Sequence, residues 1–224
     1  MKQKIQALLV ILFIAASAFL VSATEPGEAD INNQADLGEY LYTSTDIATL
    51  ESGNITYADL DSDMSTYRWA GLLGNVTGDI VLGDGNENTL YSWTGAGKMV
   101  YASTASSIVW TSLVDATVGD MPSYLTGGSD VDRYAATFGG SENIGSGIFT
   151  SLTSDFATTF NSTGASAWKT YSLKEGTNLV WAGLVSEDGD SFHNKAVDYQ
   201  MILPENGTDG ETATQAYNLW IELV

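Results

Sequence analysis

The chain has 224 residues, of which 28 are acidic and 8 are basic, so its formal net charge is −20. This balance argues against nucleic acid and anionic lipid as partners, because both need clustered lysine and arginine. The chain has no cysteine, which excludes disulfides, thiolate metal sites and a lipid anchor attached to cysteine. An acidic surface of this kind suits high salt, divalent cations or simple solubility.

Residues 1–23 have the pattern of a secretory signal peptide. Two lysines form a short basic region, an apolar run follows over residues 7–21, and Val21-Ser22-Ala23 is a small-residue cleavage site. The apolar run is about 15 residues, short of the roughly 20 that cross a bilayer, which favours cleavage over an N-terminal anchor. We therefore expect a secreted, extracellular or cell-surface protein with no transmembrane segment after cleavage. It keeps 6 basic residues against 28 acidic ones, because both lysines of the signal peptide are lost.

Four Asn-x-Ser/Thr sequons follow the signal peptide, and none has proline in the middle position. Each sequon alone is a weak signal in a chain rich in asparagine, serine and threonine. Together with export they predict a glycoprotein whose acceptor asparagines lie on exposed loops. The acceptors are Asn54, Asn75, Asn161 and Asn206.

Residues 24–50 are expected to form a flexible leader, because residues 24–33 are acidic and lack any periodicity. A first strand is possible at residues 39–44, separated from the rest of the chain by polar sequence. Residues 51–224 are then a single β domain. This layout predicts self-assembly through residues 24–46, with the detached strand of one copy completing the sheet of the next.

The first half of the domain predicts a series of strands separated by polar turns. Residues 83–88 form one turn, and residues 94–97 contain two glycines between two short strands, which predicts a hairpin. The strands are expected at residues 67–73, 76–82, 89–93, 98–102 and 108–114.

Residues 115–168 are less regular and predict long loops. One short helix is expected over residues 131–138, with Ser129 or Asp130 as its N-cap and two glycines at its end. Isolated aromatic residues in this stretch are expected to plug the core from the loops: Phe149, Phe156 and Phe160.

The second half returns to strands, expected at residues 168–173, 178–185, 197–203 and 216–224. In the last strand Tyr217, Leu219, Ile221 and Leu223 share one face. The tetrapeptide Trp-Ala-Gly-Leu occurs at residues 69–72 and again at 181–184. Two pseudo-equivalent strands and a chance recurrence of a strand pattern both explain this repeat.

Together these segments predict an all-β fold: a β-sandwich or jelly roll of about nine to ten antiparallel strands, with long loops and at most one short helix. Parallel α/β architecture is disfavoured because segments with helical periodicity are missing.

Three acidic stretches could hold a hard cation such as calcium, because carboxylate and amide oxygens are its preferred ligands. The first is not an EF-hand, since methionine stands where the loop needs glycine. The second is better explained as turn chemistry, in which Gly, Asn and Asp supply unusual backbone angles. The candidate ligands are Asp59, Asp61 and Asp63, then Asp84, Asn86 and Asn88, then Asp188 and Asp190.

No catalytic signature is present, and we expect no enzymatic activity and no cofactor beyond the possible calcium ion. A nucleophile triad would need His193, the single histidine, and no nucleophile-elbow sequence exists. Six tryptophans could line a sugar-binding face, although a packed core explains most of them. They are Trp69, Trp93, Trp110, Trp168, Trp181 and Trp220.

The segments WAGLLGNVTGDIVLGD, DYQMILPENGT and YNLWIELV resemble uncharacterised exported proteins of archaea. The layout of leader, isolated strand and β body is also similar, more distantly, to subunits of archaeal extracellular filaments. The resemblance implies a cell-surface setting and no active-site residues. The leading hypothesis is a secreted, glycosylated structural protein joined by strand addition. The alternatives are a carbohydrate- or calcium-binding module that recognises glycans, and a secreted hydrolase.

Overall fold

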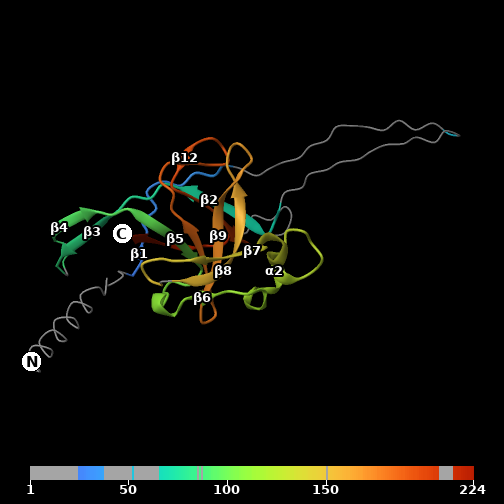
Figure 1. Cartoon of the computed structure of the whole chain (residues 1–224), viewed down its shortest axis with the longest axis horizontal. Helices are drawn as coiled ribbons and strands as arrows, with labels where there is room; N and C mark the ends of the chain where they lie inside the picture. The colour runs from blue at the N-terminus through green and yellow to red at the C-terminus, as the bar shows by residue number, and fades with distance from the viewer. Residues whose placement is uncertain are drawn as a thin grey trace, which may run out of the picture.

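The structure of the protein is a computed structural model (Figure 1). It describes residues 25–37, 52, 66–84, 86, 88–149, 151–206 and 214–224. The expected donor strand at residues 39–44, the candidate ligands at 59–63 and the sequon asparagine at position 54 lie outside these residues.

The predicted all-β fold is confirmed, since every strand pairing in the described part of the chain is antiparallel. The main sheet has eight strands and follows the order β1-β14-β5-β10-β9-β8-β7, with β6 paired to β9 beside that path. Its strands are β1 (Gly27–Glu28), β5 (Gly97–Ser103), β6 (Val114–Asp115), β7 (Gly140–Ile144), β8 (Leu152–Phe160), β9 (Ser166–Glu175), β10 (Asn178–Leu184) and β14 (Asn218–Leu223).

Three two-stranded sheets accompany the main sheet. They are β2 (Trp69–Gly74) with β13 (Tyr199–Pro204), β3 (Asp79–Gly83) with β4 (Thr89–Thr94), and β11 (Gly189–Asp190) with β12 (Ala196–Val197). The two Trp-Ala-Gly-Leu copies fall on β2 and β10, and their tryptophan rings meet edge to face at 6.0 Å.

The main sheet is buried on both faces, so its central strands contribute to two separate cores. On β5, Met99 and Tyr101 point into one core, whereas Val100 and Ala102 point into the other, as the alternation of a strand requires. Residues 108–113 cover the first face, and the sheet formed by β2 and β13 covers the second. This double burial explains why the central strands are apolar without alternation.

The second core is built around Trp181, whose ring also contacts Phe138 at 5.4 Å. Met201 and Leu203 of β13 enter the same core and fix the smaller sheet onto the main one. Truncation of a buried tryptophan to alanine costs about 3–5 kcal/mol, so the packing of the two layers depends strongly on this residue.

The last strand, β14, differs from the expected one-sided strand. Leu219 and its neighbours do share one face, but Trp220 and Glu222 on the other face are more deeply buried. The Glu222 carboxylate is 1% exposed and accepts hydrogen bonds from the Tyr101 hydroxyl at 2.8 Å and from the Gly147 amide. A carboxylate enters this core because both of its oxygens find donors there.

The predicted hairpin between residues 89–93 and 98–102 is wrong. β4 pairs with β3 instead, and β5 lies between β14 and β10 in the main sheet. The turn at residues 84–88 closes the actual hairpin, because the Asp84 side chain accepts hydrogen bonds from the backbone amides of Asn86 and Asn88.

The strand expected at residues 108–114 is also wrong, because a 3-10 helix, η1 (Trp110–Ser112), precedes the short strand β6. Its turn lets Ile108, Trp110 and Leu113 all reach the first core, which a flat strand could not do.

Residues 115–168 hold more structure than the expected loops. β7 and β8 form a hairpin, and Phe156 lies within β8. The predicted helix is shorter than expected, α3 (Tyr134–Thr137), and Arg133 is its N-cap. A second short helix, α2 (Ser123–Thr126), and a 3-10 helix, η2 (Val118–Asp120), are further additions. None of the helices in the described residues is long and apolar enough to cross a membrane.

Candidate functional site

The clearest candidate for a functional surface is the edge of the main sheet at β14. On this edge β1 pairs with only two of the six residues of β14, Gly27 opposite Ile221 and Glu28 opposite Trp220. One further bond extends the pairing, from the Ala29 amide to the Leu219 carbonyl at 2.9 Å.

Backbone groups of β14 therefore face outward at alternate residues, 219, 221 and 223. The backbone groups of the intervening residues of β14 point toward β5. Val224, directly after β14, continues this pattern, because it exchanges two backbone hydrogen bonds with Ala96, at 3.0 and 2.9 Å. An edge strand with outward amides and carbonyls is a template for pairing with another strand. β1 occupies this template over a short length only.

In the leader segment, residues 25–37, the backbone hydrogen bonds to the main sheet are those of residues 27–29. Pro26 is buried, but Gly27 and Glu28 are exposed, and beyond them Ile31 and Leu37 are 61% and 58% exposed. Each backbone hydrogen bond contributes a net of about 0.5–1.5 kcal/mol. The two-residue pairing therefore contributes only a few such bonds.

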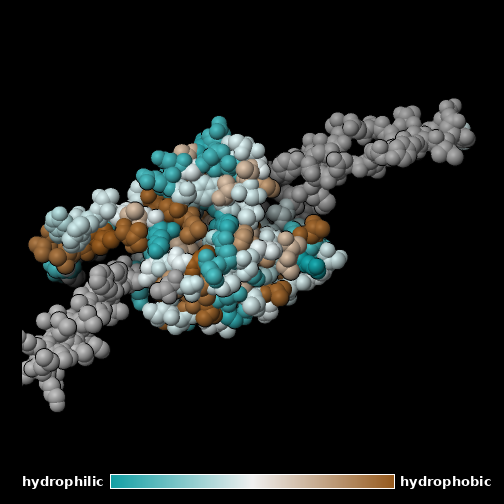
Figure 2. All heavy atoms as spheres, viewed as in Figure 1, coloured by the Kyte–Doolittle hydropathy of each residue, from teal (hydrophilic) through white to brown (hydrophobic). Residues whose placement is uncertain are grey.

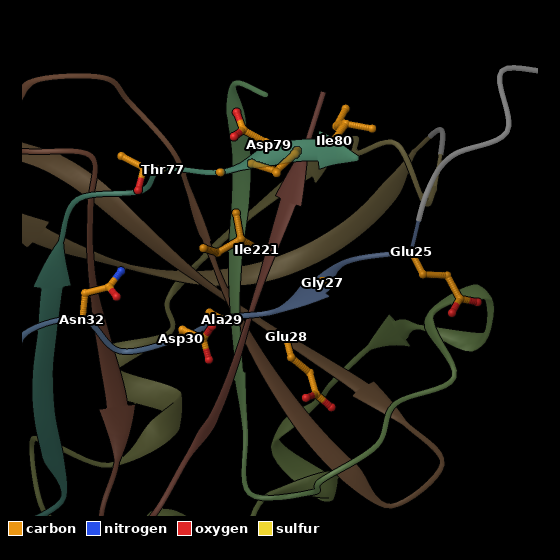
Figure 3. Close-up of a pocket in the computed structure, with 12 residues that line it drawn as sticks. Glu25, Gly27, Glu28, Ala29, Asp30, Asn32, Thr77, Asp79, Ile80 and Ile221 are labelled. Atoms are coloured by element: carbon orange, nitrogen blue, oxygen red, sulfur yellow. The ribbon is translucent and has the colours of Figure 1, made fainter. Parts of the chain in front are cut away.

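A groove of about 420 Å³ runs between the leader segment and residues 77–80 (Figure 3). Ile221 lies between these two parts of the chain, and the ionisable side chains that line the groove are all acidic. They are Glu25, Glu28, Asp30 and Asp79.

Two glycines, Gly78 and Gly95, lie against Leu223, which lines this groove. A Cβ atom at Gly78 would lie 2.8 Å from Leu223 Cδ1, and one at Gly95 would lie 3.0 Å from Leu223 Cβ. The end of β14 therefore packs closely against both glycines, and a side chain at either position would require Leu223 to shift. This packing fixes the position of the edge onto which β1 is added.

Next to the groove, β3 and β4 form a hairpin that projects from the body, and we call it the hairpin arm (Figure 1). Every residue of β4 is exposed, and Figure 2 shows apolar side chains gathered along the arm. Ile80 lies opposite Trp93 and Leu82 opposite Tyr91, so these four share one face. The Tyr91 and Trp93 rings are 4.7 Å apart.

The candidate cation ligands Asp84, Asn86 and Asn88 lie in the turn of the hairpin arm. The Asn88 side chain donates to both oxygens of the Asp84 carboxylate, at 3.1 and 2.9 Å. These bonds, followed by those of the backbone amides, lower the pKa of Asp84. The geometry is that of a capped turn, in which the carboxylate is already engaged.

Asp188 and Asp190 lie elsewhere, in the turn around β11. Asp188 adopts a left-handed backbone with φ of 53°, and the Asp190 carboxylate accepts a hydrogen bond from the Ser162 hydroxyl at 2.7 Å. The Asp190 carbonyl accepts from the Trp168 indole at 2.8 Å. In the described part of the chain, no three His, Cys, Asp or Glu side chains are grouped to hold a metal ion.

The sequon asparagines Asn75 and Asn206 are exposed. Asn161 is half-buried at the end of β8, where its side-chain oxygen accepts bonds from the backbone amides of Thr163 and Ala165 at 3.1 and 3.0 Å. The Thr163 hydroxyl donates to the same oxygen at 2.8 Å.

His193 lies beside Ser191, with its Nδ1 3.0 Å from the serine Oγ. The pair does not form a nucleophile site, because Ser191 is 0% exposed and also bonds the Lys195 carbonyl at 2.7 Å. Its hydroxyl closes a local turn instead.

Four of the six tryptophans are buried, and Trp69 packs against Trp181 and Phe138. Only Trp93, at 50%, has a broadly exposed ring. The tryptophans therefore form no shared sugar-binding face.

The Asp120 carboxylate accepts several hydrogen bonds at the surface of the described part of the chain. It accepts hydrogen bonds from the Lys174 ammonium and from the Thr117 amide and hydroxyl. These donors, Lys174 first, lower the pKa of Asp120 to about 2.

Comparisons with family models, with curated proteins and with solved structures find no match for this chain. The candidate site therefore rests on the geometry of the chain itself.

Sequence reasoning did not find the β14 edge or the exposed hairpin arm. β1 is formed by glycine and glutamate, which carry no strand propensity, so no local signal marks it. The apolar residues of β3 and β4 have the pattern of central strands. Only the turn at residues 84–88 signals that they pair with each other.

Proposed function

We propose that this protein is a non-enzymatic structural subunit of a secreted, glycosylated cell-surface assembly, such as a filament or an envelope layer. Copies are joined by β-strand addition, in which the N-terminal segment of one copy pairs with β14 of its neighbour. The observation that carries the proposal is the edge of β14, occupied by only two residues of the chain's own leader segment.

Three further features support this function. The leader segment is acidic and mostly exposed, as a segment that exchanges between copies would be. The hairpin arm next to the edge exposes apolar side chains that a neighbouring copy would cover. The signal-peptide pattern and the exposed sequons at Asn75 and Asn206 agree with a surface location.

The first test is deletion of residues 24–46 from the secreted form. We expect the deletion to abolish fibres or layers in electron microscopy, while near-ultraviolet circular dichroism shows a folded body. The matched control substitutes Ile31 and Leu37 by serine, which keeps the length of the segment and all of its pairing residues. Assembly that survives the deletion would contradict the proposal.

A second test reports the pairing directly, since the chain has no cysteine. Gly27 and Ile221 are directly opposite each other, and a Cβ atom at Gly27 meets nothing within 4 Å. Opposite residues of an antiparallel pair lie about 4.5–5.5 Å apart, which suits a disulfide. Two single variants, Gly27→Cys and Ile221→Cys, are mixed under assembly conditions and oxidised.

We expect a disulfide-linked heterodimer in the mixture, because each variant alone lacks the partner cysteine at that position. The control mixture pairs Gly27→Cys with Val109→Cys, whose side chain is 54% exposed in a different part of the fold. A heterodimer yield no higher than in this control would show that β1 does not pair between copies.

A further inference from the structure

A second groove, of about 360 Å³, lies away from the β14 edge and has a different chemistry. Three aromatic residues, Tyr124, Trp181 and Tyr217, line it together with polar side chains. Aromatic rings beside amides and hydroxyls form the lining that binds neutral polar ligands, with the rings providing contact area and the polar groups orientation.

Trp181 is 2% exposed, yet no described residue accepts a hydrogen bond from its indole N–H. The indole N–H is not among the fully buried side-chain atoms that lack a hydrogen bond in the described residues, so it reaches solvent. Trp181 lines the groove, and we place its exposed N–H there. A tryptophan N–H that reaches solvent beside a groove can donate to a bound ligand in place of water.

The walls of the groove are fixed by other contacts. The Tyr217 hydroxyl donates to the Pro204 carbonyl, and the buried Arg68 guanidinium donates to the Tyr124 carbonyl. Burial raises the pKa of Tyr124, and the nearby Glu205 carboxylate raises it further, so this phenol stays protonated. The Tyr217 ring is therefore held through its hydroxyl, and Tyr124 through its backbone.

The polar groups of the rim retain free acceptors. Asn178 and Gln215 use their amide nitrogens, donating to Glu175 and to the Ala216 carbonyl at 3.0 and 3.1 Å. No described residue donates to their side-chain oxygens, which can accept hydrogen bonds from hydroxyl groups. Asp120 also lines the groove, but its charge is neutralised by Lys174.

We propose that this groove is a binding site for a neutral saccharide, with the Trp181 N–H donating to a sugar oxygen. The aromatic rings of Tyr124 and Tyr217 supply apolar contact for the face of a pyranose. The rim amide oxygens accept hydrogen bonds from sugar hydroxyls. An anionic sugar is disfavoured, because Glu205 lies beside the groove and the chain is strongly acidic.

The test uses protein made without glycosylation and titrated with neutral hexasaccharides of glucose, mannose and N-acetylglucosamine. A hexamer of galacturonic acid is the charged comparison. Binding is measured by calorimetry and by tryptophan fluorescence. We expect saturable binding of at least one neutral probe with a Kd of about 0.1–1 mM, since an open groove leaves much of the ligand in water.

The variant Trp181→Phe removes the donor and keeps an aromatic ring in the core. We expect it to weaken binding about three- to tenfold, the effect of one lost neutral hydrogen bond. Trp220→Phe is the matched control, because it makes the same change in the opposite core and should leave the affinity unchanged. If Trp181→Phe fails to fold, the double variant Asn178→Ala, Gln215→Ala replaces it and is expected to weaken binding similarly.

A saccharide of this chemistry could be free or could be the protein's own glycan at Asn206, which follows Pro204 of the groove by two residues. If glycosylated protein does not bind the probe, and binds it after Asn206→Gln, the attached glycan is the occupant of the groove. Equal binding by both forms identifies a free saccharide. Absence of saturable binding to every neutral probe, or unchanged affinity in both sets of groove variants, would overturn the proposal while leaving strand addition untouched.

Discussion

The carboxylate of Asp120 is held by donors from two parts of the chain, the Lys174 ammonium and the groups of Thr117. The folded-state pKa of Asp120, about 2, lies below its value of about 3.9 in an unfolded chain. A depressed pKa of this kind stabilises the folded state above about pH 4, and the contribution is lost as the pH falls through about 2.

We therefore expect Lys174→Met to lower the melting temperature by roughly one to three degrees at pH 6. The difference from the natural protein should shrink as the pH falls from about 4 to 2, where Asp120 becomes protonated with or without its partner. Lys195→Met is the control, since Lys195 is exposed and its ammonium makes no ion pair with a described residue. A difference that persists at pH 2 would show that Lys174 acts through packing instead of charge.

Single residues also show how far sequence reasoning reaches. The strand at Trp181 could be predicted, because an apolar run bounded by polar turns suits a strand in a core. The burial of Glu222 could not be predicted, because its two donors come from residues 75 and 121 positions away. Pairing over such distances leaves no local trace in the sequence.

At the level of elements, the hairpin arm stands apart because no third strand of the described residues pairs with it. An isolated two-stranded hairpin is marginally stable in water, and cross-strand contacts contribute only about 0.2–1 kcal/mol each. The contact between Tyr91 and Trp93 is thus a large part of what holds the arm together.

We expect the double variant Tyr91→Ala, Trp93→Ala to speed hydrogen exchange of the arm, residues 79–94, while β5 and β10 stay protected. Aromatic contacts of this type are worth about 0.5–1.5 kcal/mol beyond their buried area, so exchange should accelerate several-fold. Mass spectrometry of peptides from the two regions makes the comparison. Val118→Ala, at an apolar residue of equal exposure, is the control. Unchanged exchange in the arm would mean that its backbone bonds suffice.

Sequence patterns identified most strands of this fold but not their partners. Residues 89–93 were placed correctly as a strand and paired wrongly, because two candidate turns with glycine flank them. The capped Asp84 turn forms the hairpin, whereas the chain at Gly95 passes into another sheet. Turn composition alone does not distinguish these outcomes, since the second depends on Leu223, more than a hundred residues away.

At the scale of the whole molecule, the main sheet has one end that its own chain closes incompletely. The sequence predicted a donor strand at residues 39–44, which lie outside the described residues, and it predicted no strand at residues 27–28. It could not predict β1, because the two residues of this strand are chosen by the free edge of β14 and not by their own propensity.

Because β1 covers part of the β14 edge of its own chain, it competes with the strand of a second copy for that edge. A strand tethered to its acceptor is present at an effective concentration on the order of millimolar, so dilute copies keep their own strand. The double variant Gly27→Cys, Ile221→Cys should therefore form an intramolecular disulfide at low micromolar protein concentration. As the protein concentration approaches about 1 mM, it should form disulfides between chains. Electrophoresis without reductant measures the ratio, and a ratio independent of concentration would contradict the exchange. Assembly would then be confined to places where copies accumulate, and copies at low concentration would remain monomeric.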